Sequence, residues 1–270
     1  MGFTSFYPPY FEIPGIPQVQ LRKLGNTNLE LSPIGFGAFK IGRNQGTKYP
    51  TAYDLPDMDA VARLLNGVLD MGINHIDTAP AYGLSEERIG KTIAHRRDEY
   101  ILSSKIGETF VDGKSSYCFD AQHVRQSVEA SLKKLKTDRL DVLLIHSPAD
   151  DVSLQQLTDC VPTMQALKAR GDVRFIGLSG KTTHGFELAM AWSDVLMIEY
   201  NINDTQHAQL ISDAADKGIG VLCKKGLASG HLPPRDAIQF VLQNPAITNI
   251  VVGGLNLSHL QDNLQYAQSI

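Results

Sequence analysis

Short apolar runs alternate with longer stretches of helical periodicity along this chain, and the alternation occurs eight times. The runs are rich in Val, Ile and Leu, as strands buried on both faces of a sheet are, and each gap is long enough for a helix. Repeated β-α units predict a parallel sheet, and eight of them predict a closed (β/α)8 TIM barrel. The predicted strands are Ile34 to Gly37, Ile73 to Asp77, Tyr100 to Ser104, Leu140 to His146, Val173 to Leu178, Val195 to Glu199, Ile219 to Cys223 and Asn249 to Val252.

The segments between these runs are predicted to be helices, and several carry capping residues. Asp120 and Ser258 stand at predicted N-caps, and Ser258 with Gln261 has the spacing of a capping box. Glycines follow three of the predicted helices, where C′ glycines are common, at Gly72, Gly171 and Gly218. The predicted helices are Asp57 to Met71, Ser85 to His95, Asp120 to Leu135, Leu154 to Arg170, His184 to Trp192, Thr205 to Lys217, Pro234 to Gln243 and Ser258 to Ala267.

The stretch before the first barrel strand is predicted to form a two-stranded hairpin, because LRKLG and LELS flank a GNTN turn. Such a β-hairpin would close the floor of the barrel. The 270 residues fit one barrel, since this fold usually needs about 250. We therefore expect one domain over residues 1–270, with residues 1–20 as an N-terminal arm.

Charge and composition exclude several classes of partner. A formal net charge of -4 and a pI near 6.0 provide no long-range attraction to phosphate backbones or anionic lipid, so neither nucleic acid nor membrane is expected. No stretch approaches the roughly 18 uninterrupted apolar residues of a membrane span, and MGFTSFYPPYFEIPGIP lacks the basic start of a signal peptide. The three cysteines have no metal-ligand spacing and indicate reduced thiols of a cytoplasmic protein. We expect a monomer or a weak homo-oligomer.

Polar residues end several of the predicted strands, at the edge where the active sites of such barrels lie. INHID ends in Asp77, ILSSK in Lys105 and LLIH in His146, and Tyr82 follows Asp77 by five residues. An ammonium about 4 Å from a phenol contributes roughly 4 kcal/mol at an effective dielectric near 20, so Lys105 would lower the pKa of Tyr82 from about 10 by about three units. A carboxylate such as Asp77 would keep a buried lysine charged. These residues predict a proton-donating tyrosine, and His146 would either orient the carbonyl or share the proton.

The run NHIDTAPAYGLSEERIGK, with ILSSK and DVLLIHSP downstream in the same order, resembles the signature of the aldo-keto reductases. The resemblance extends from about Leu21 to the C-terminus. It implies a carbonyl reductase that uses NADP(H), with NAD(H) as the alternative cofactor and no metal, and that acts on a small-molecule carbonyl or alcohol. The family's catalytic residues fall on Asp77, Tyr82, Lys105 and His146.

The cofactor contacts that the resemblance implies match the family unevenly. Ser179 in GLSGK stands where the family has a serine that binds the nicotinamide carboxamide, but Gly180 replaces the asparagine that follows it. Met197 in MIEYN replaces a glutamine that contacts the same group, and KKGL replaces Tyr-Ser-Pro-Leu after the seventh strand, so the aromatic residue that stacks on nicotinamide is absent. The implied contacts are Gly37, Ala38, Phe39, Asp77, Ser179, Gly180, Tyr200, Lys224, Lys225, Gly226, Leu227, Gly253, Gly254, Leu255, His259, Asp262 and Asn263.

Two of these segments leave alternatives open. We hypothesise that Lys224 lays its methylene stem against the nicotinamide ring, or that Lys225 contributes charge at the pyrophosphate; the alternative is a pair of solvated lysines. The segment IVVGGLNLSHLQDNL resembles the family's adenosine-binding loop and helix. Leu255 and Asn256 stand there where NADP-selective members have Lys or Arg, which predicts a weak preference for NADP.

The substrate pocket is predicted to be open, with Phe39 and residues 43–56 as its walls, because the loop GLASGHLPPRD is short for the family. Rival classes remain. His75, Asp77 and His146 suggest a metal-dependent hydrolase, although their spacing does not match a paired-histidine motif. A Schiff-base aldolase would use Lys105 or Lys224. A cofactor-binding sensor or regulatory subunit with little turnover is the non-enzyme alternative.

Overall fold

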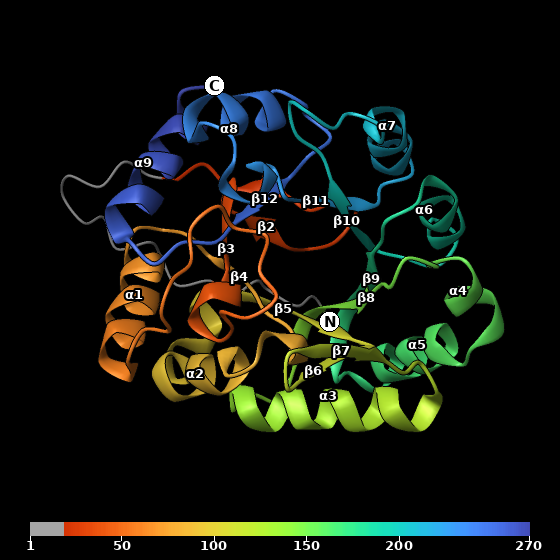
Figure 1. The fold of residues 1–270 in the computed structure, drawn as a ribbon. Helices are drawn as coiled ribbons and strands as arrows, with labels where there is room; N and C mark the ends of the chain where they lie inside the picture. The colour runs from red at the N-terminus through yellow and green to blue at the C-terminus, as the bar shows by residue number, and fades with distance from the viewer. Residues whose placement is uncertain (1–18) are drawn as a thin grey trace, which may run out of the picture.

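The structure is a computed structural model that describes residues 19–270. Eight parallel strands form a closed barrel in the order β10-β11-β12-β3-β4-β5-β8-β9, which Figure 1 shows nearly along the barrel axis. The predicted (β/α)8 barrel is therefore confirmed. The predicted arm, residues 1–20, lies outside the described residues except for its last two. The barrel strands are β3 (Ile34–Gly37), β4 (His75–Asp77), β5 (Ile101–Ile106), β8 (Leu140–His146), β9 (Val173–Ser179), β10 (Val195–Glu199), β11 (Gly220–Lys224) and β12 (Asn249–Val252).

Helices surround the barrel as an outer ring (Figure 1). None of the helices in residues 19–270 is long and apolar enough to span a membrane. Short 3-10 turns occur at η1 (Ala38–Ile41), η2 (Pro80–Tyr82), η3 (Ala94–Glu99) and η4 (Ala228–Gly230). The α-helices are α1 (Met58–Asp70), α2 (Ser85–Thr92), α3 (Ala121–Leu135), α4 (Ser153–Leu157), α5 (Cys160–Arg170), α6 (Thr183–Ala189), α7 (Ala208–Asp216), α8 (Pro234–Leu242) and α9 (Leu257–Gln268).

The helix ends match the predicted caps in α3 but not in α9. The Asp120 side chain accepts a hydrogen bond from the backbone N–H of His123 at 2.8 Å, which confirms it as an N-cap. The prediction that Ser258 caps α9 is wrong, because the helix already begins at Leu257 and Asn256 is the capping residue. The Asn256 Oδ1 accepts from the backbone N–H of Ser258 at 2.9 Å. An asparagine in an extended conformation satisfies the free N–H groups of the first turn as well as a serine does.

The predicted helix from Leu154 to Arg170 is also wrong as a single element. The chain forms α4 and α5 instead, and Thr158 between them is extended, with φ -124° and ψ 164°. Pro162 explains the break, because proline has no N–H to donate to the carbonyl four residues earlier and its ring would clash with that carbonyl in a continuous helix.

The hairpin predicted on the barrel floor is present, as β1 (Arg22–Lys23) paired antiparallel with β2 (Glu30–Leu31). Leu24 and Leu29 at its turn are fully buried. They belong to a cluster with side chains from inside the barrel, including Val142 of β8 and others of β5, β10 and β11. The hairpin therefore covers the end of the barrel opposite the carboxyl ends of the strands.

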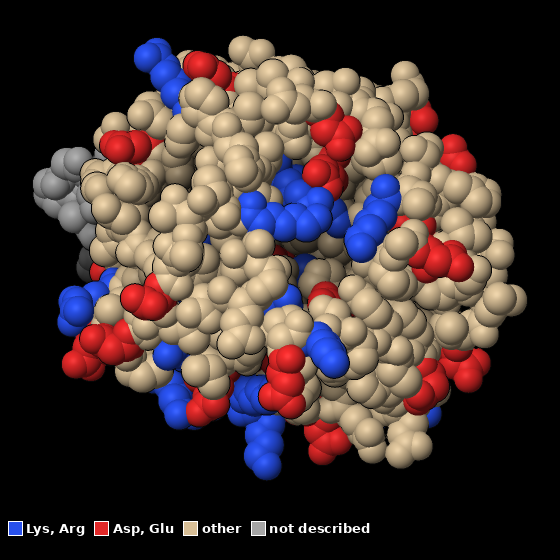
Figure 2. Space-filling model, in the orientation of Figure 1, with Lys and Arg blue, Asp and Glu red and all other residues tan. Residues whose placement is uncertain are grey.

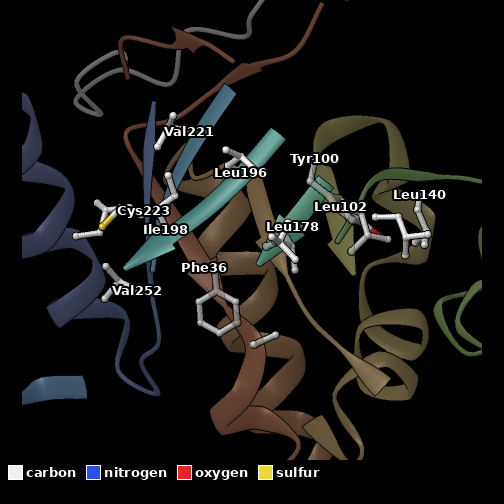
Figure 3. Close-up of a cluster of buried hydrophobic side chains, with 14 of the residues drawn as sticks. Phe36, Tyr100, Leu102, Leu140, Leu178, Leu196, Ile198, Val221, Cys223 and Val252 are labelled. Carbon is white, nitrogen blue, oxygen red and sulfur yellow. The ribbon is translucent and has the colours of Figure 1, made fainter. Parts of the chain in front are cut away.

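Successive side chains of each barrel strand point alternately into the barrel and out toward the helices. In β8, Val142 and Leu144 belong to the cluster inside the barrel, whereas Leu143 and Ile145 belong to the larger cluster between strands and helices. Figure 3 shows part of this outer layer, with Phe36, Leu178, Ile198 and Val252 among its side chains. Because strand side chains alternate with a period of two, His146 follows Val142 and Leu144 on the inner side.

A second hairpin was not predicted. β6 (Glu108–Val111) pairs antiparallel with β7 (Lys114–Tyr117), between β5 and α3. The segment has few apolar residues and no strong alternation of apolar and polar residues. In the structure β7 is exposed throughout, and β6 is only partly buried. In Figure 1 the hairpin lies across the lower part of the barrel. It brings Glu108 over the carboxyl ends of the strands.

Candidate active site

A buried ion pair occupies the barrel mouth between β4 and β5. The Lys105 Nζ lies 2.8 and 2.7 Å from the two carboxylate oxygens of Asp77, and it also donates to the carbonyl of Thr78 at 2.9 Å. Ser103, two residues before Lys105 on the same strand, donates to Asp77 Oδ1 at 2.7 Å. Burial lowers the pKa of Lys105, but Asp77 and Tyr82 outweigh it and raise the value above the ordinary one. Lys105 therefore stays an ammonium.

Tyr82 lies directly beside this pair, at the end of η2. The Lys105 Nζ lies 4.8 Å from the centre of the Tyr82 ring, and the ammonium lowers the pKa of the phenol. Phe39 packs edge-on against Tyr82 at 5.1 Å between ring centroids, and His146 does so at 5.9 Å. Burial raises the pKa of Tyr82 by more than Lys105 lowers it. The expectation of a near-neutral phenol is therefore wrong for this structure, because loss of water around the phenolate outweighs the neighbouring charge.

His146 contacts a carboxylate that the sequence did not reveal. The His146 Nδ1 lies 2.7 Å from Glu108 Oε2, and Ser115 donates to Glu108 Oε1 at 2.6 Å. Burial raises the pKa of Glu108, but the close contact with His146 and the hydrogen bond from Ser115 outweigh that effect and bring the value to about 2. Burial lowers the pKa of His146 in spite of Glu108, so the ring is neutral at pH 7. A neutral ring that keeps its proton on Nδ1 beside Glu108 presents Nε2 as an acceptor.

His75 does not join the site as a free ligand. Its ring is fully buried, and its nitrogens lie 2.9 Å from Asn249 Oδ1 and 3.0 Å from Ser103 Oγ. Both nitrogens are thus engaged inside the barrel, which argues against the metal-dependent hydrolase. Within residues 19–270 no three His, Cys, Asp or Glu side chains are grouped so that they could hold a metal ion.

Lys224 connects the ends of β9 and β11. Its Nζ donates to Ser179 Oγ at 3.0 Å and to the carbonyl of Gly180 at 2.6 Å. Burial, then the charge of Lys225, lower the pKa of Lys224 to about 7. Lys225 itself forms an ion pair with Glu199. In Figure 2, which has the orientation of Figure 1, Lys and Arg side chains gather around the hollow near the centre of the molecule.

A cavity of about 530 Å³ lies beside β12 and the start of α9. It is lined by seven of the residues predicted to contact the cofactor and by others that were not predicted. Lys40, in η1, is among the latter, and its Nζ lies 4.0 Å from the ring centre of Tyr49 and 5.1 Å from that of Tyr53. The predicted residues on the cavity wall are Leu227, Gly253, Gly254, Leu255, His259, Asp262 and Asn263.

The remaining predicted cofactor residues lie at or behind the mouth. Tyr200 is 8% exposed and stacks on Phe240 at 5.3 Å, so its ring packs in the core instead of lining the cavity. Gly226 also has a packing role, because a Cβ there would lie 2.3 Å from Ile250 Cδ1. Gly37 and Ala38 are buried where β3 passes into η1, and Phe39 follows them beside Tyr82.

A family model described as the aldo/keto reductase family matches residues 33–237. The chain belongs to this family. L-galactose dehydrogenase from Arabidopsis thaliana is 31% identical over 291 residues, which cover 92% of this chain and 88% of the relative. D-threo-aldose 1-dehydrogenase from a Pseudomonas species is 26% identical over 305 residues, which cover 88% of this chain and 90% of the relative. The crystal structure of a Pseudomonas aeruginosa protein assigned to the aldo-keto reductases is 41% identical, with a TM-score of 0.85 over 92% of this chain and 95% of that one. Family membership makes the chain an oxidoreductase.

Proposed function

We propose that this protein is an NADP(H)-dependent carbonyl reductase that reduces aldehydes or ketones, or oxidises the corresponding alcohols or sugars. The arrangement of Tyr82, Lys105 and Asp77 is the observation that carries the proposal. It places a phenol that can give up a proton beside a buried ammonium whose own charge is fixed by a carboxylate. The cofactor-sized cavity nearby supports the same reaction class.

In this proposal the residues at the mouth handle the proton. The cofactor, when bound, supplies a hydride to the carbonyl carbon. Tyr82 gives its hydroxyl proton to the carbonyl oxygen, so that the carbonyl becomes an alcohol, and Lys105 stabilises the phenolate that remains. Asp77 keeps Lys105 positive, and His146 offers Nε2 to a hydroxyl group of the bound substrate or product.

The cavity beside α9 fits the adenosine and phosphate end of a dinucleotide. Gly253 and Gly254 bring bare backbone to its wall, next to the helix start at Leu257. A helix N-terminus with free N–H groups favours an anion. Lys40 is the only Lys or Arg among the described residues on this wall. It supports NADP(H) as the cofactor, although Leu255 and Asn256 lack charge, and NAD(H) is the alternative.

Small polyhydroxylated carbonyl compounds are the substrate class we propose. Two relatives are, by their names, dehydrogenases of L-galactose and of D-threo-aldoses. The mouth of this chain offers matching groups, because His146, which is paired with Glu108, lies beside Tyr82 and can bind a hydroxyl group. Phe39 would pack on the apolar face of a sugar ring.

The proposal is tested by following the absorbance of NADPH and NADH with a panel of aldehydes and sugars, with and without a chelator. The wild type is expected to oxidise the reduced cofactor whether or not the chelator is present, and Tyr82→Phe is expected to lose about 100-fold or more in kcat while still binding NADPH. Cofactor binding without turnover by the wild type would instead support the sensor. Full activity of Tyr82→Phe would refute its role as the acid.

A further inference from the structure

Lys224 is a partly buried ammonium that has no carboxylate partner among residues 19–270. Its two hydrogen bonds go to neutral acceptors, Ser179 Oγ and the carbonyl of Gly180. Lys105, by contrast, lies between both oxygens of Asp77. A lysine taken out of water is costly unless a carboxylate compensates it. Packing therefore gives no reason for a lysine at this position.

The charges around Lys224 are mostly of its own sign. Lys105, Lys181 and Lys225 all lower its pKa, and Glu199 is the acidic group that raises it. Glu199 is already in an ion pair with Lys225. Lys224 also lowers the pKa of His146, after burial and Lys105, and the His146 ring is neutral at pH 7. An anionic or strongly accepting ligand group would relieve this excess of positive charge.

The hydrogen bonds around Lys224 leave a defined set of donors and acceptors. An ammonium has three N–H groups and can only donate, so one N–H remains after Ser179 and Gly180 are satisfied. Ser179 Oγ must be the acceptor in its bond with Lys224, which leaves its own O–H to donate. The Gly180 carbonyl has a second lone pair. Together they offer two donors and one acceptor, which complement the C=O and NH2 of a primary carboxamide.

We propose that Lys224 is a positioning residue that holds the carboxamide of the nicotinamide ring, together with Ser179 and Gly180. The inference rests on the proposed function, because it needs a nicotinamide at the mouth. Neither residue 180, directly after β9, nor residue 197 in β10 has an amide side chain that could bind the carboxamide. Residue 180 is a glycine, and Met197 packs with the apolar cluster inside the barrel. Lys224, at the end of β11, would bind the carboxamide in their place.

The lowered pKa of Lys224 gives the carboxamide contact a pH dependence. Its pKa of about 7 means that the ammonium is lost as the pH rises through neutrality. A carboxamide oxygen favours the charged form, so binding of a nicotinamide raises this pKa and is strongest at low pH. The affinity for reduced cofactor is therefore expected to fall between pH 6 and pH 9, and a ligand without the nicotinamide is expected to show no such fall from this source.

The test compares two ligands on purified wild type, Lys224→Met, Lys224→Arg and the control Lys181→Met by titration calorimetry. NADPH carries the carboxamide, and 2′-phospho-ADP-ribose lacks the nicotinamide. At pH 6 we expect Lys224→Met to weaken NADPH binding about tenfold, as for one charge-assisted hydrogen bond, and to leave the fragment unchanged. Lys224→Arg should restore much of the affinity and keep it at pH 9, because arginine does not titrate. Lys181→Met removes a nearby exposed charge and should change neither ligand.

Each of the following outcomes would overturn the inference. Equal weakening of both ligands by Lys224→Met would indicate a general structural role. Unchanged NADPH binding in Lys224→Met would show that the amine does not contact the nicotinamide. Wild-type protein that binds neither ligand would refute the proposed function itself, and with it this inference. If wild type binds NADPH and every variant binds it equally well, only the role of Lys224 is refuted.

Discussion

Two lysines at the barrel mouth have pKa values that are shifted in opposite directions. Lys105 has a carboxylate at 2.7 Å, and its pKa is raised, whereas Lys224 has neutral acceptors and a pKa of about 7. Tyr82 beside Lys105 has a raised pKa because burial disfavours its phenolate. The acid and the cation that supports it therefore keep their protons over the whole physiological pH range.

The raised pKa values of Tyr82 and Lys105 predict the pH profile of carbonyl reduction. With the cofactor saturating, kcat/KM for the carbonyl substrate should stay flat from pH 6 to about pH 9, since the pKa values of Tyr82 and Lys105 lie above their ordinary values of roughly 10 and 10.4. Protonated Tyr82 is the active form of the acid, so activity should decline only at higher pH. Stopped-flow or steady-state rates across this range provide the measurement. A decline with a midpoint near pH 7 would contradict the assignment of Tyr82 as the acid.

The sequence revealed the residues of the mouth that stand at strand ends, and missed those that arrive from other segments. Asp77, Lys105 and His146 follow apolar runs whose period of two puts them on the inner side. Ser103 could have been found by the same rule, since it precedes Lys105 by two residues. Glu108 and Lys40 could not, because Glu108 depends on the unpredicted β6–β7 hairpin and Lys40 on a 3-10 turn. Burial of Tyr82 was likewise invisible, which is why its pKa was expected to fall.

At the scale of elements, strand positions were predicted closely because apolar runs and their ends fix them. β3, β8, β10 and β12 have the predicted bounds. Helix ends were less predictable, because several neighbouring polar residues can serve as a cap. In α9, Asn256 takes the role expected of Ser258, and α4 and α5 are separated where Pro162 disrupts the helix.

The correction in α9 leads to a stability prediction. Asn256→Ala should reduce the free energy of unfolding by about 1 kcal/mol, because it removes the side chain that accepts from the first turn. Ser258→Ala, the matched change at the position first expected to be the cap, should cost less than half as much. Urea unfolding followed by circular dichroism measures both. A larger loss for Ser258→Ala than for Asn256→Ala would reverse the assignment of the cap.

At the scale of the whole molecule, the two ends of the barrel differ in their side chains. The floor hairpin and the inner apolar cluster fill one end, and the Asp77–Lys105 pair lies at the other. We propose that these parts behave as one domain, because the strands close into one ring and both ends of the barrel share the same strands. The closed ring was predictable from eight β-α units. The cavity wall was predictable only in part: the residues of β12, α9 and the loop between them were expected to contact the cofactor, whereas Lys40 of η1 meets them only in the folded chain.

Hydride transfer at the mouth, from a cofactor in the cavity to a carbonyl beside Tyr82, is tested most directly by isotope transfer. NADPH with deuterium at both C4 positions is incubated with wild type and an aldehyde that it reduces, and the alcohol is analysed by mass spectrometry. We predict one deuterium on the former carbonyl carbon of essentially every product molecule. An alcohol that forms at the enzymatic rate without deuterium at that carbon would contradict direct transfer.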